Sequence, residues 1–249
     1  MTNREKYKFD YFTIENYRNQ LLYALENGFE FISFTDEFNK KRKEIIWRHE
    51  FSLDIALEMA KIENELGIST TYFFQVHSEF YNILERYSSD ILLEIKTLGH
   101  HIGLHFDSHY YNIQSEDQLN QYITQDKEYF EKVFNIKLEV FSFHNTTPFT
   151  LNCRNKTYGG LLNVYSDYYK KKYNYCADST GYWRFEVLDD LLNDKNVTHL
   201  QVLVHDAMWS NEVLSPRQRV RKSIQENADR IKDQYDRILI QFGAKNIDD

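Results

Sequence analysis

The sequence has few of the residues that interrupt or cross-link a chain. It contains two prolines, Pro148 and Pro216, and two cysteines, Cys153 and Cys176, among 249 residues. The cysteines form no CxxC pair and are too few for a disulfide scaffold, so we expect reduced thiols and a cytoplasmic protein. No repeat, low-complexity stretch or linker divides the chain, and its length suits one domain.

Long hydrophobic runs are also absent. No stretch approaches the ~18 apolar residues of a membrane-spanning helix, so we expect no membrane span. Residues 1–6 lead directly into polar sequence, so we expect no signal peptide either. Positive charge is in the minority, and the net charge of −8 argues against nucleic-acid binding. The short basic clusters at 40–43 and 170–172 are predicted to lie on solvated surface.

Three widespread catalytic signatures are missing. The chain has no GxSxG nucleophile motif, no phosphate-binding glycine loop and no Rossmann fingerprint. Any chemistry must therefore come from side chains that the fold brings together.

Strand-like and helix-like segments alternate along the chain, which indicates an α/β fold. Most of the strand-like segments are continuous apolar runs, as is typical of parallel strands buried on both faces. We predict strands at 30–34, 44–48, 70–75, 101–106, 140–143, 162–165, 175–177 and 198–204. We predict helices before residue 28 and at 54–66, 91–98, 115–134, 183–192 and 216–239.

Histidines and carboxylates follow several of these strands directly. Parallel sheets place their chemistry at the carboxyl ends of the strands, so these side chains are expected to meet at one rim. The rim residues are Arg48, His49 and Glu50; His105, Asp107 and His109; His144 and Asn145; and His205 and Asp206.

His105 and His109 form an HxxxH pair, which lies on one face if a helical turn follows the strand. Two imidazoles at this spacing can hold Zn²⁺ or a similar cation, and Glu50 is the best candidate for a third ligand. The alternative is a pair of surface histidines. Asp107, between the two, can point either way.

His205 follows the most apolar strand and is a candidate general acid that protonates a leaving amine. The alternative is a core histidine with a structural hydrogen bond. Asp206 either orients His205 or caps the next element. His144 and Asn145 either bind substrate or hydrogen-bond to loop backbone.

Five segments resemble the motifs of polysaccharide deacetylase-like proteins (the NodB-homology group). WRHEFSLD at 47–54, with the helix and strand that follow it to residue 74, resembles their opening. GHHIGLHFDSH at 99–109 resembles their second motif, SFHN at 142–145 their third, GYWR at 181–184 their fourth and VLVH at 202–205 their fifth. The resemblance covers about residues 29–216.

This resemblance implies a distorted (β/α)7-type barrel over 29–249, which follows an N-terminal helical segment at 1–28. It implies a divalent metal, commonly zinc, held by one Asp and two His, a second Asp as base and a late His as acid. By motif position, His105 and His109 become metal ligands with Glu50, and His205 becomes the acid. Arg48, His144, Asn145 and Trp183 are then expected to contact the substrate.

The first motif departs from the family pattern. Relatives read RHDVD there, whereas this chain reads Arg48-His49-Glu50 and is two residues shorter. Glu50 alone remains of the acidic pair, so Asp54 or Asp107 is needed as a substitute for the other carboxylate.

The resemblance therefore implies a metal-dependent hydrolase that removes an acyl group from an N-acylated sugar or sugar nucleotide during surface-polysaccharide biosynthesis. The alternative is a catalytically impaired barrel that binds a sugar or sugar nucleotide without hydrolysis.

Overall fold

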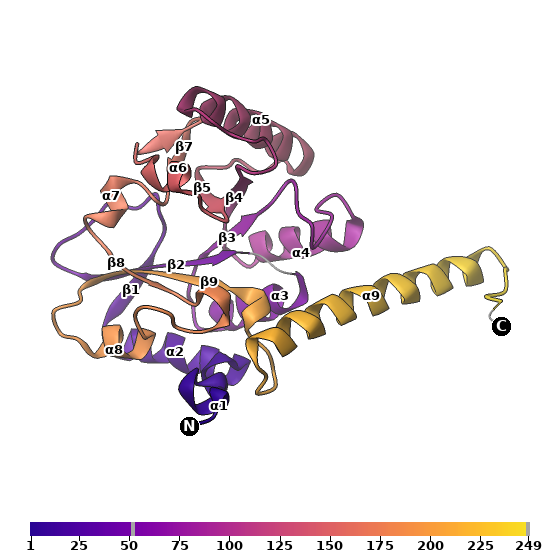
Figure 1. Cartoon of the computed structure of the whole chain (residues 1–249), viewed down its shortest axis with the longest axis horizontal. Coiled ribbons are helices and arrows are strands. Elements are labelled where there is room, and N and C mark those ends of the chain that lie inside the picture. Colours follow the sequence, from indigo (N-terminus) through magenta and orange to yellow (C-terminus); the bar gives the residue numbers. More distant parts are fainter. Residues whose placement is uncertain (51–52, 248–249) are drawn as a thin grey trace.

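The core of the fold is a mostly parallel, curled sheet with helices on its outer face (Figure 1). The computed structural model describes residues 1–50 and 53–247, without the side chains of residues 53 and 54. Phe51, Ser52 and the side chain of Asp54, which belong to the first sequence motif, thus lie outside the described residues. None of the described helices combines the length and apolar character that crossing a bilayer requires.

The strand order over the described residues is β6-β7-β5-β4-β3-β2-β9-β8, with β1 also paired to β2. Among the strands of these residues, β6 and β7 alone pair in antiparallel orientation. The strands are β1 (Phe29–Ile32), β2 (Lys43–Glu50), β3 (Thr71–Phe74), β4 (His101–Asp107), β5 (Val140–His144), β6 (Thr157–Tyr158), β7 (Leu161–Asn163), β8 (Asn174–Ala177) and β9 (His199–His205). The sheet curls into a half-barrel that ends at β6 and β8, which confirms the predicted α/β fold of the distorted-barrel type.

The helices are α1 (Asn3–Lys6), α2 (Ile14–Glu26), α3 (Leu53–Glu65), α4 (Arg86–Thr97), α5 (Glu116–Phe134), α6 (Pro148–Asn152), α7 (Asp167–Lys170), α8 (Leu188–Asn193) and α9 (Pro216–Gln241). Short 3-10 turns η1 (Phe9–Phe12), η2 (Ser179–Gly181) and η3 (Asp206–Met208) join them. The helix predicted at 183–192 is too long. Thr180 and Gly181 have positive φ, and residues 182–187 form bends and irregular chain up to the start of α8.

Strand β2 is the centre of the sheet because it pairs with three other strands. Strand β9 pairs along one edge from Glu44 to Glu50. On the opposite edge, β1 pairs with the first half of β2 and β3 with the second half. The end of β2 therefore lies between β3 and β9, beside the ends of both.

Alternation along the strands separates two sets of side chains. Ile45 and Trp47 of β2 and Leu200, Val202 and Val204 of β9 belong to the core packed under the helices. Ile102, Leu104, Phe106, Phe141 and Phe143 belong to the corresponding core of β4 and β5. Since successive side chains of a strand point to opposite faces, Glu50, His105, His144 and His205 all point to the inner, concave side.

Helix α9 is the last element, and its second half extends well beyond the sheet (Figure 1). It starts with a capping box in which Ser215 accepts a hydrogen bond from the backbone N–H of Gln218, and Pro216 occupies a permitted first-turn position. Arg219 anchors the first turns by donating to the carbonyl oxygens of Gly181 and Met208, at 3.0 and 2.7 Å. The helix therefore starts next to the end of β9.

Candidate active site

Glu50 lies at the centre of the rim, with a different set of partners on each carboxylate oxygen. Its Oε2 lies 3.0 Å from Nε2 of His205 and 3.6 Å from Nε2 of His105. Its Oε1 accepts a hydrogen bond from Ser142 at 3.1 Å and lies 3.4 Å from Nη1 of Arg48. Burial opposes ionisation, but the positive charges of His205 and Arg48 lower the pKa of Glu50 far below its usual value. Glu50 is therefore a carboxylate at every pH near neutral.

His205 lies between two carboxylates. Its Nδ1 is 2.6 Å from Oδ1 of Asp178, and its Nε2 faces Glu50. Burial favours the neutral ring, yet the charges of Asp178 and Glu50 outweigh burial and raise the pKa of His205 well above its usual value. His205 is thus an imidazolium that can donate a proton, as the predicted acid role requires.

Asp178 was not among the predicted site residues. It follows β8 and accepts hydrogen bonds from the backbone N–H of His205, at 3.0 and 3.1 Å, and from the indole N–H of Trp209, at 2.8 Å. These donors fix the carboxylate toward Nδ1 of His205. The rule that chemistry gathers at strand ends applies to Asp178 as well, because it is the first residue after β8.

Arg48 is fully buried beneath Glu50. Its guanidinium donates to Ser142 at 2.6 Å, to Tyr165 at 3.2 Å and to Tyr175 at 3.3 Å. These bonds hold the cation on the inner side of the sheet, where it supports the Glu50 carboxylate. A direct contact between Arg48 and a substrate stays a prediction.

His105 and His144 form an imidazole pair beside Glu50. Nε2 of His105 lies 3.0 Å from Nδ1 of His144, and Asn145 donates to Nε2 of His144 at 2.9 Å. Burial lowers the pKa of His105 to about 4 and also lowers that of His144. Both rings are therefore neutral near pH 7. Nδ1 of His105 is buried and has no hydrogen-bond partner among the described residues.

The structure separates His109 from His105. Strand β4 continues to Asp107, so the helical turn that would align the HxxxH pair is absent at this point. The Asp107 carboxylate accepts the backbone N–H of His109 at 2.8 Å, and Nδ1 of the His109 ring lies 3.2 Å from it. His109 is half exposed and lines a different cavity from His105. Its role as a ligand and that of Asp107 as a base stay predictions.

The predicted metal site can be compared with this geometry. Within residues 1–50 and 53–247, no group of three or more His, Cys, Asp and Glu side chains is arranged to hold a metal ion. Two cations, Arg48 and the His205 imidazolium, already compensate the charge of Glu50. The described side chains therefore do not form a three-ligand group as they stand, and the ligand set Glu50, His105 and His109 stays a prediction.

The strand ends open into a small cavity of about 190 Å³. Glu50, His105, His144, Asn145 and His205 line its polar side. Its apolar side is formed by Phe80, Ala207 and Met208, together with Val220 and Ile224 of α9. A carboxylate, an imidazolium and two neutral imidazoles thus face a partly apolar space, an arrangement suited to acid–base chemistry on a small group.

Trp183 does not line this cavity. Its ring lies 5.7 Å from that of Phe12 and packs, partly buried, against the core cluster beneath the helices. Its predicted contact with substrate stays a prediction.

A second group of buried polar residues lies on the other side of β2. His49 points toward the helices, where its ring is stacked on Tyr72, with 4.0 Å between the ring centroids. Its two nitrogens lie 2.6 Å from Asp206 and 2.8 Å from Glu63. Asp206 therefore pairs with His49, and Asp178 is the residue that orients His205.

No protein-family model matches the chain, and no curated protein does so either. Among solved structures, the chain is similar to a family 4 carbohydrate esterase from Bacillus anthracis, with 17% identity, a TM-score of 0.45 and coverage of 91% of this chain and 87% of that one. It is also similar to a chitin deacetylase from Colletotrichum lindemuthianum (14% identity, TM-score 0.42, 73% and 81% covered). A third similar structure is a Streptococcus pyogenes deacetylase in complex with acetate (13% identity, TM-score 0.41, 84% and 85% covered).

Proposed function

We propose that the chain hydrolyses the acyl group of an N-acylated sugar, with Glu50 as base and His205 as acid. The observation that carries this proposal is the line of contacts from Asp178 through His205 to Glu50, at 2.6 and 3.0 Å. Two carboxylates around one imidazolium provide both a proton donor and a proton acceptor at one rim. The sequence resemblance to polysaccharide deacetylase-like proteins supports the choice of reaction.

The reaction needs two proton transfers. Glu50 accepts a proton from water as the water oxygen bonds to the acyl carbon. His205 then protonates the amide nitrogen as the C–N bond breaks, which releases the carboxylic acid and the amine. Asp178 accepts the Nδ1–H of the His205 ring and so stabilises the imidazolium, whose second proton lies on Nε2.

The ion pair between Glu50 and His205 must open for this chemistry. When the substrate nitrogen takes the hydrogen bond of His205, Oε2 of Glu50 becomes free to accept the water proton. Arg48 and Ser142 hold the other oxygen meanwhile, so the carboxylate keeps its orientation.

The size of the cavity limits what can reach Glu50. Its volume of about 190 Å³ is smaller than the roughly 300–1,000 Å³ of cavities that enclose a drug-sized ligand. An acyl group fits such a space, with its methyl group against Met208 and Ile224. The rest of a sugar must then lie outside it.

A metal ion would polarise the acyl carbonyl when bound. Since the described residues do not form its site, the steps above are assigned to side chains alone. The cytoplasmic location and the place of the sugar in surface-polysaccharide biosynthesis are likewise part of the proposal, and they rest on the sequence.

One observation favours a second function, sugar binding without hydrolysis. The base is already paired: Oε2 of Glu50 lies 3.0 Å from the His205 imidazolium, and its pKa is strongly lowered. A carboxylate of such low basicity is a weak base for water. This candidate predicts sugar binding with no release of acid.

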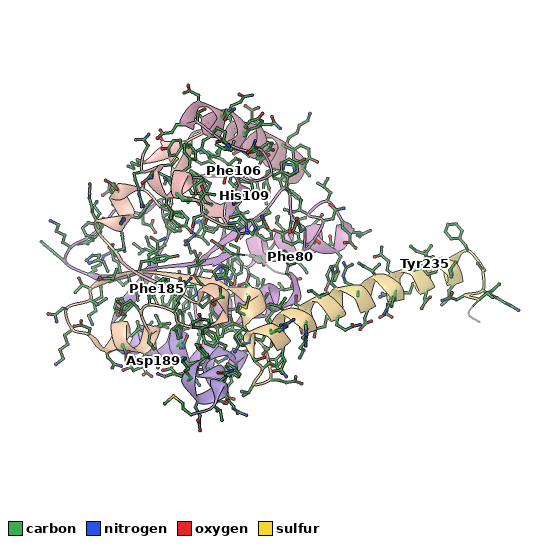
Figure 2. The ribbon with its side chains drawn as sticks, in the orientation of Figure 1. Phe80, Phe106, His109, Phe185, Asp189 and Tyr235 are labelled. Atoms are coloured by element: carbon green, nitrogen blue, oxygen red, sulfur yellow. The ribbon has the colours of Figure 1, made fainter. Side chains whose placement is uncertain are left out.

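Acetate release decides between the two. The purified chain is incubated with N-acetylglucosamine, N,N′-diacetylchitobiose and UDP-N-acetylglucosamine, and free acetate is measured. We expect release by the wild type and a loss of about 100-fold or more in Glu50→Gln and His205→Asn. Phe185→Ala, an exposed aromatic outside the cavity, is the control (Figure 2). Binding of a sugar without any acetate release would support the second function instead.

A further inference from the structure

A second cavity, of about 860 Å³, adjoins the first. Three separate parts of the chain form it: the loop that follows β3, the loop that follows β4 and the middle of α9. Phe80 lines both cavities and lies between the sheet and α9 (Figure 2). A molecule that enters the smaller cavity from the larger one would therefore pass Phe80.

Tyr110 is an exposed aromatic residue in this cavity that is nevertheless held in place. One face of its ring is stacked on His77, with 3.7 Å between ring centroids and an interplanar angle of 7°. About 60% of Tyr110 remains exposed. The apolar face of an exposed aromatic ring stays in contact with water unless a ligand covers it. Because the Tyr110 ring is already held in one position, this exposed face indicates a binding surface.

Partly buried hydrogen bonds hold the stack. Nε2 of His77 lies 2.8 Å from the hydroxyl of Tyr111, and this hydroxyl donates to the buried carboxylate of Asp126. Tyr111 is in turn stacked on Tyr122 of α5. This series of side-chain contacts, from Asp126 to Tyr110, fixes the exposed ring before any ligand arrives. Less conformational entropy is therefore lost when a ligand binds.

The wall of the cavity formed by α9 is fixed by an ion pair. Arg230 makes two contacts with Glu85, at 2.6 and 3.2 Å, and its guanidinium lies 4.3 Å from the centre of the Tyr87 ring. Both partners are largely buried, with side chains 15% and 27% exposed. This pair holds α9 against the loop after β3, so the two walls of the cavity face each other at a set distance.

The polar groups in the cavity are of mixed type. Glu79 and Asp107 are carboxylates, Asn82 and Asn227 are amides, and His109 is an imidazole. Arg230 is committed to Glu85. Phosphate groups would meet these carboxylates, whereas the hydroxyl groups of a neutral ligand can bond to carboxylate, amide and imidazole alike.

We propose that the larger cavity binds a neutral sugar ring, whose apolar face stacks on Tyr110 and whose neighbouring acyl group passes Phe80 into the smaller cavity. A sugar ring combines an apolar C–H face with a border of hydroxyls, which matches an aromatic platform surrounded by carboxylate, amide and imidazole groups. The position of the acyl group rests on the proposed function, but the binding of the ring does not. The proposal also places any phosphate of a sugar nucleotide outside this cavity.

The test is the binding of N,N′-diacetylchitobiose, measured by calorimetry. We expect the wild type to bind it and Tyr110→Ala to bind about tenfold or more weakly, because the stacking surface is lost. Phe80→Ala is expected to weaken binding as well. Phe185→Ala and Tyr235→Ala remove exposed aromatic rings that line neither cavity, at 81% and 56% exposure, and should bind as the wild type does (Figure 2).

Two results would overturn the inference: no binding of the disaccharide by the wild type, or equal binding by the wild type and Tyr110→Ala. Acetate release separates this inference from the proposed function. If Tyr110→Ala loses binding while the wild type releases no acetate, the sugar subsite stands and the hydrolase fails. If the wild type releases acetate and Tyr110→Ala binds normally, the hydrolase stands and the subsite fails.

Discussion

Nδ1 of His49 lies 2.6 Å from Oδ1 of Asp206, although the two residues are 157 positions apart. Both side chains are fully buried, and Nε2 of His49 also lies 2.8 Å from the buried Glu63 of α3. His49 is next to Glu50 on β2, and Asp206 is next to His205 on β9. The buried ion pair therefore fixes the relative position of the two strand ends that carry the candidate base and acid.

This pair predicts a loss of stability in mild alkali. Burial opposes the charged ring, but Glu63 and Asp206 raise the pKa of His49 to about 9, above its ordinary value of 6.5. A group whose pKa is raised by folding stabilises the protein fully below its unfolded pKa and loses that effect as pH passes its folded pKa. We expect the free energy of unfolding to fall by about 3 kcal/mol between pH 6.5 and pH 9 or slightly above. Urea unfolding across this range measures it.

A His49→Gln variant is the control for this titration. It should be less stable at pH 6.5, because two buried carboxylates lose their cation. The free energy of unfolding of this variant should also fall much less between pH 6.5 and pH 9. The fall that remains is due to His205, whose pKa is raised too. An unchanged decline in His49→Gln would show that the titrating group is another residue.

The convergence of Glu50, His105 and His205 was predictable because it follows from two simple rules. Continuous apolar runs identified β2, β4 and β9, and the carboxyl ends of parallel strands meet. Asp178 was missed because β8, with the sequence NYCA, is short and has little apolar pattern. Asp178 reaches His205 because β8 pairs with β9, and this neighbour relationship can be predicted only when the strand order is known.

The separation of His105 and His109 depends on a local detail. HxxxH spacing implies one face only in a helix, whereas His105 lies within an extended strand. The carboxylate of Asp107 accepts a hydrogen bond from the backbone N–H of His109, so the residues after β4 form a turn and not a helix. The partners of His49 were equally hard to predict, since Glu63 comes from a helix and Asp206 from the turn after β9.

The contact between Asp178 and His205 predicts a change in pH dependence. Asp178→Asn removes the charge that raises the pKa of the imidazole, so His205 should lose its proton at lower pH. We expect the alkaline limb of kcat/KM for acetate release to move to lower pH, with activity reduced by about 100-fold or more. NMR titration of the His205 ring gives the same readout without turnover.

Asp189→Asn is the matched control for that variant. Asp189 accepts a hydrogen bond from Tyr11 and lies near the N-terminal helices, away from both cavities (Figure 2). Its pH profile should match that of the wild type. If Asp178→Asn keeps the wild-type alkaline limb and ring pKa, Asp178 does not set the protonation state of His205.

Metal content tests the ligand set that the resemblance implies. Because the described side chains do not form a three-ligand group, we expect the purified, dialysed chain to retain no stoichiometric zinc. Added zinc should shift neither the Tm of the wild type nor the Tm of a His105→Ala/His109→Ala variant. About one equivalent of zinc in the wild type, lost in the double variant, would restore the ligand set predicted from the sequence. Asp54→Asn would then show whether Asp54 supplies the missing carboxylate.

The burial of Arg48 predicts that it contributes to stability as well as to the site. Removing it takes the guanidinium away from the Glu50 carboxylate and leaves Ser142, Tyr165 and Tyr175 without this donor. We expect Arg48→Met to lower the free energy of unfolding by about 3 kcal/mol or more, since breaking a buried pair exposes the cost of an uncompensated charge.

Arg18→Met is the control, because Arg18 pairs with Glu65 at the surface, with 39% and 60% exposure. Such a pair contributes at most about 1 kcal/mol. Equal effects of the two substitutions in urea unfolding would mean that water reaches the Arg48 guanidinium, and that the cation does not hold Glu50 in place.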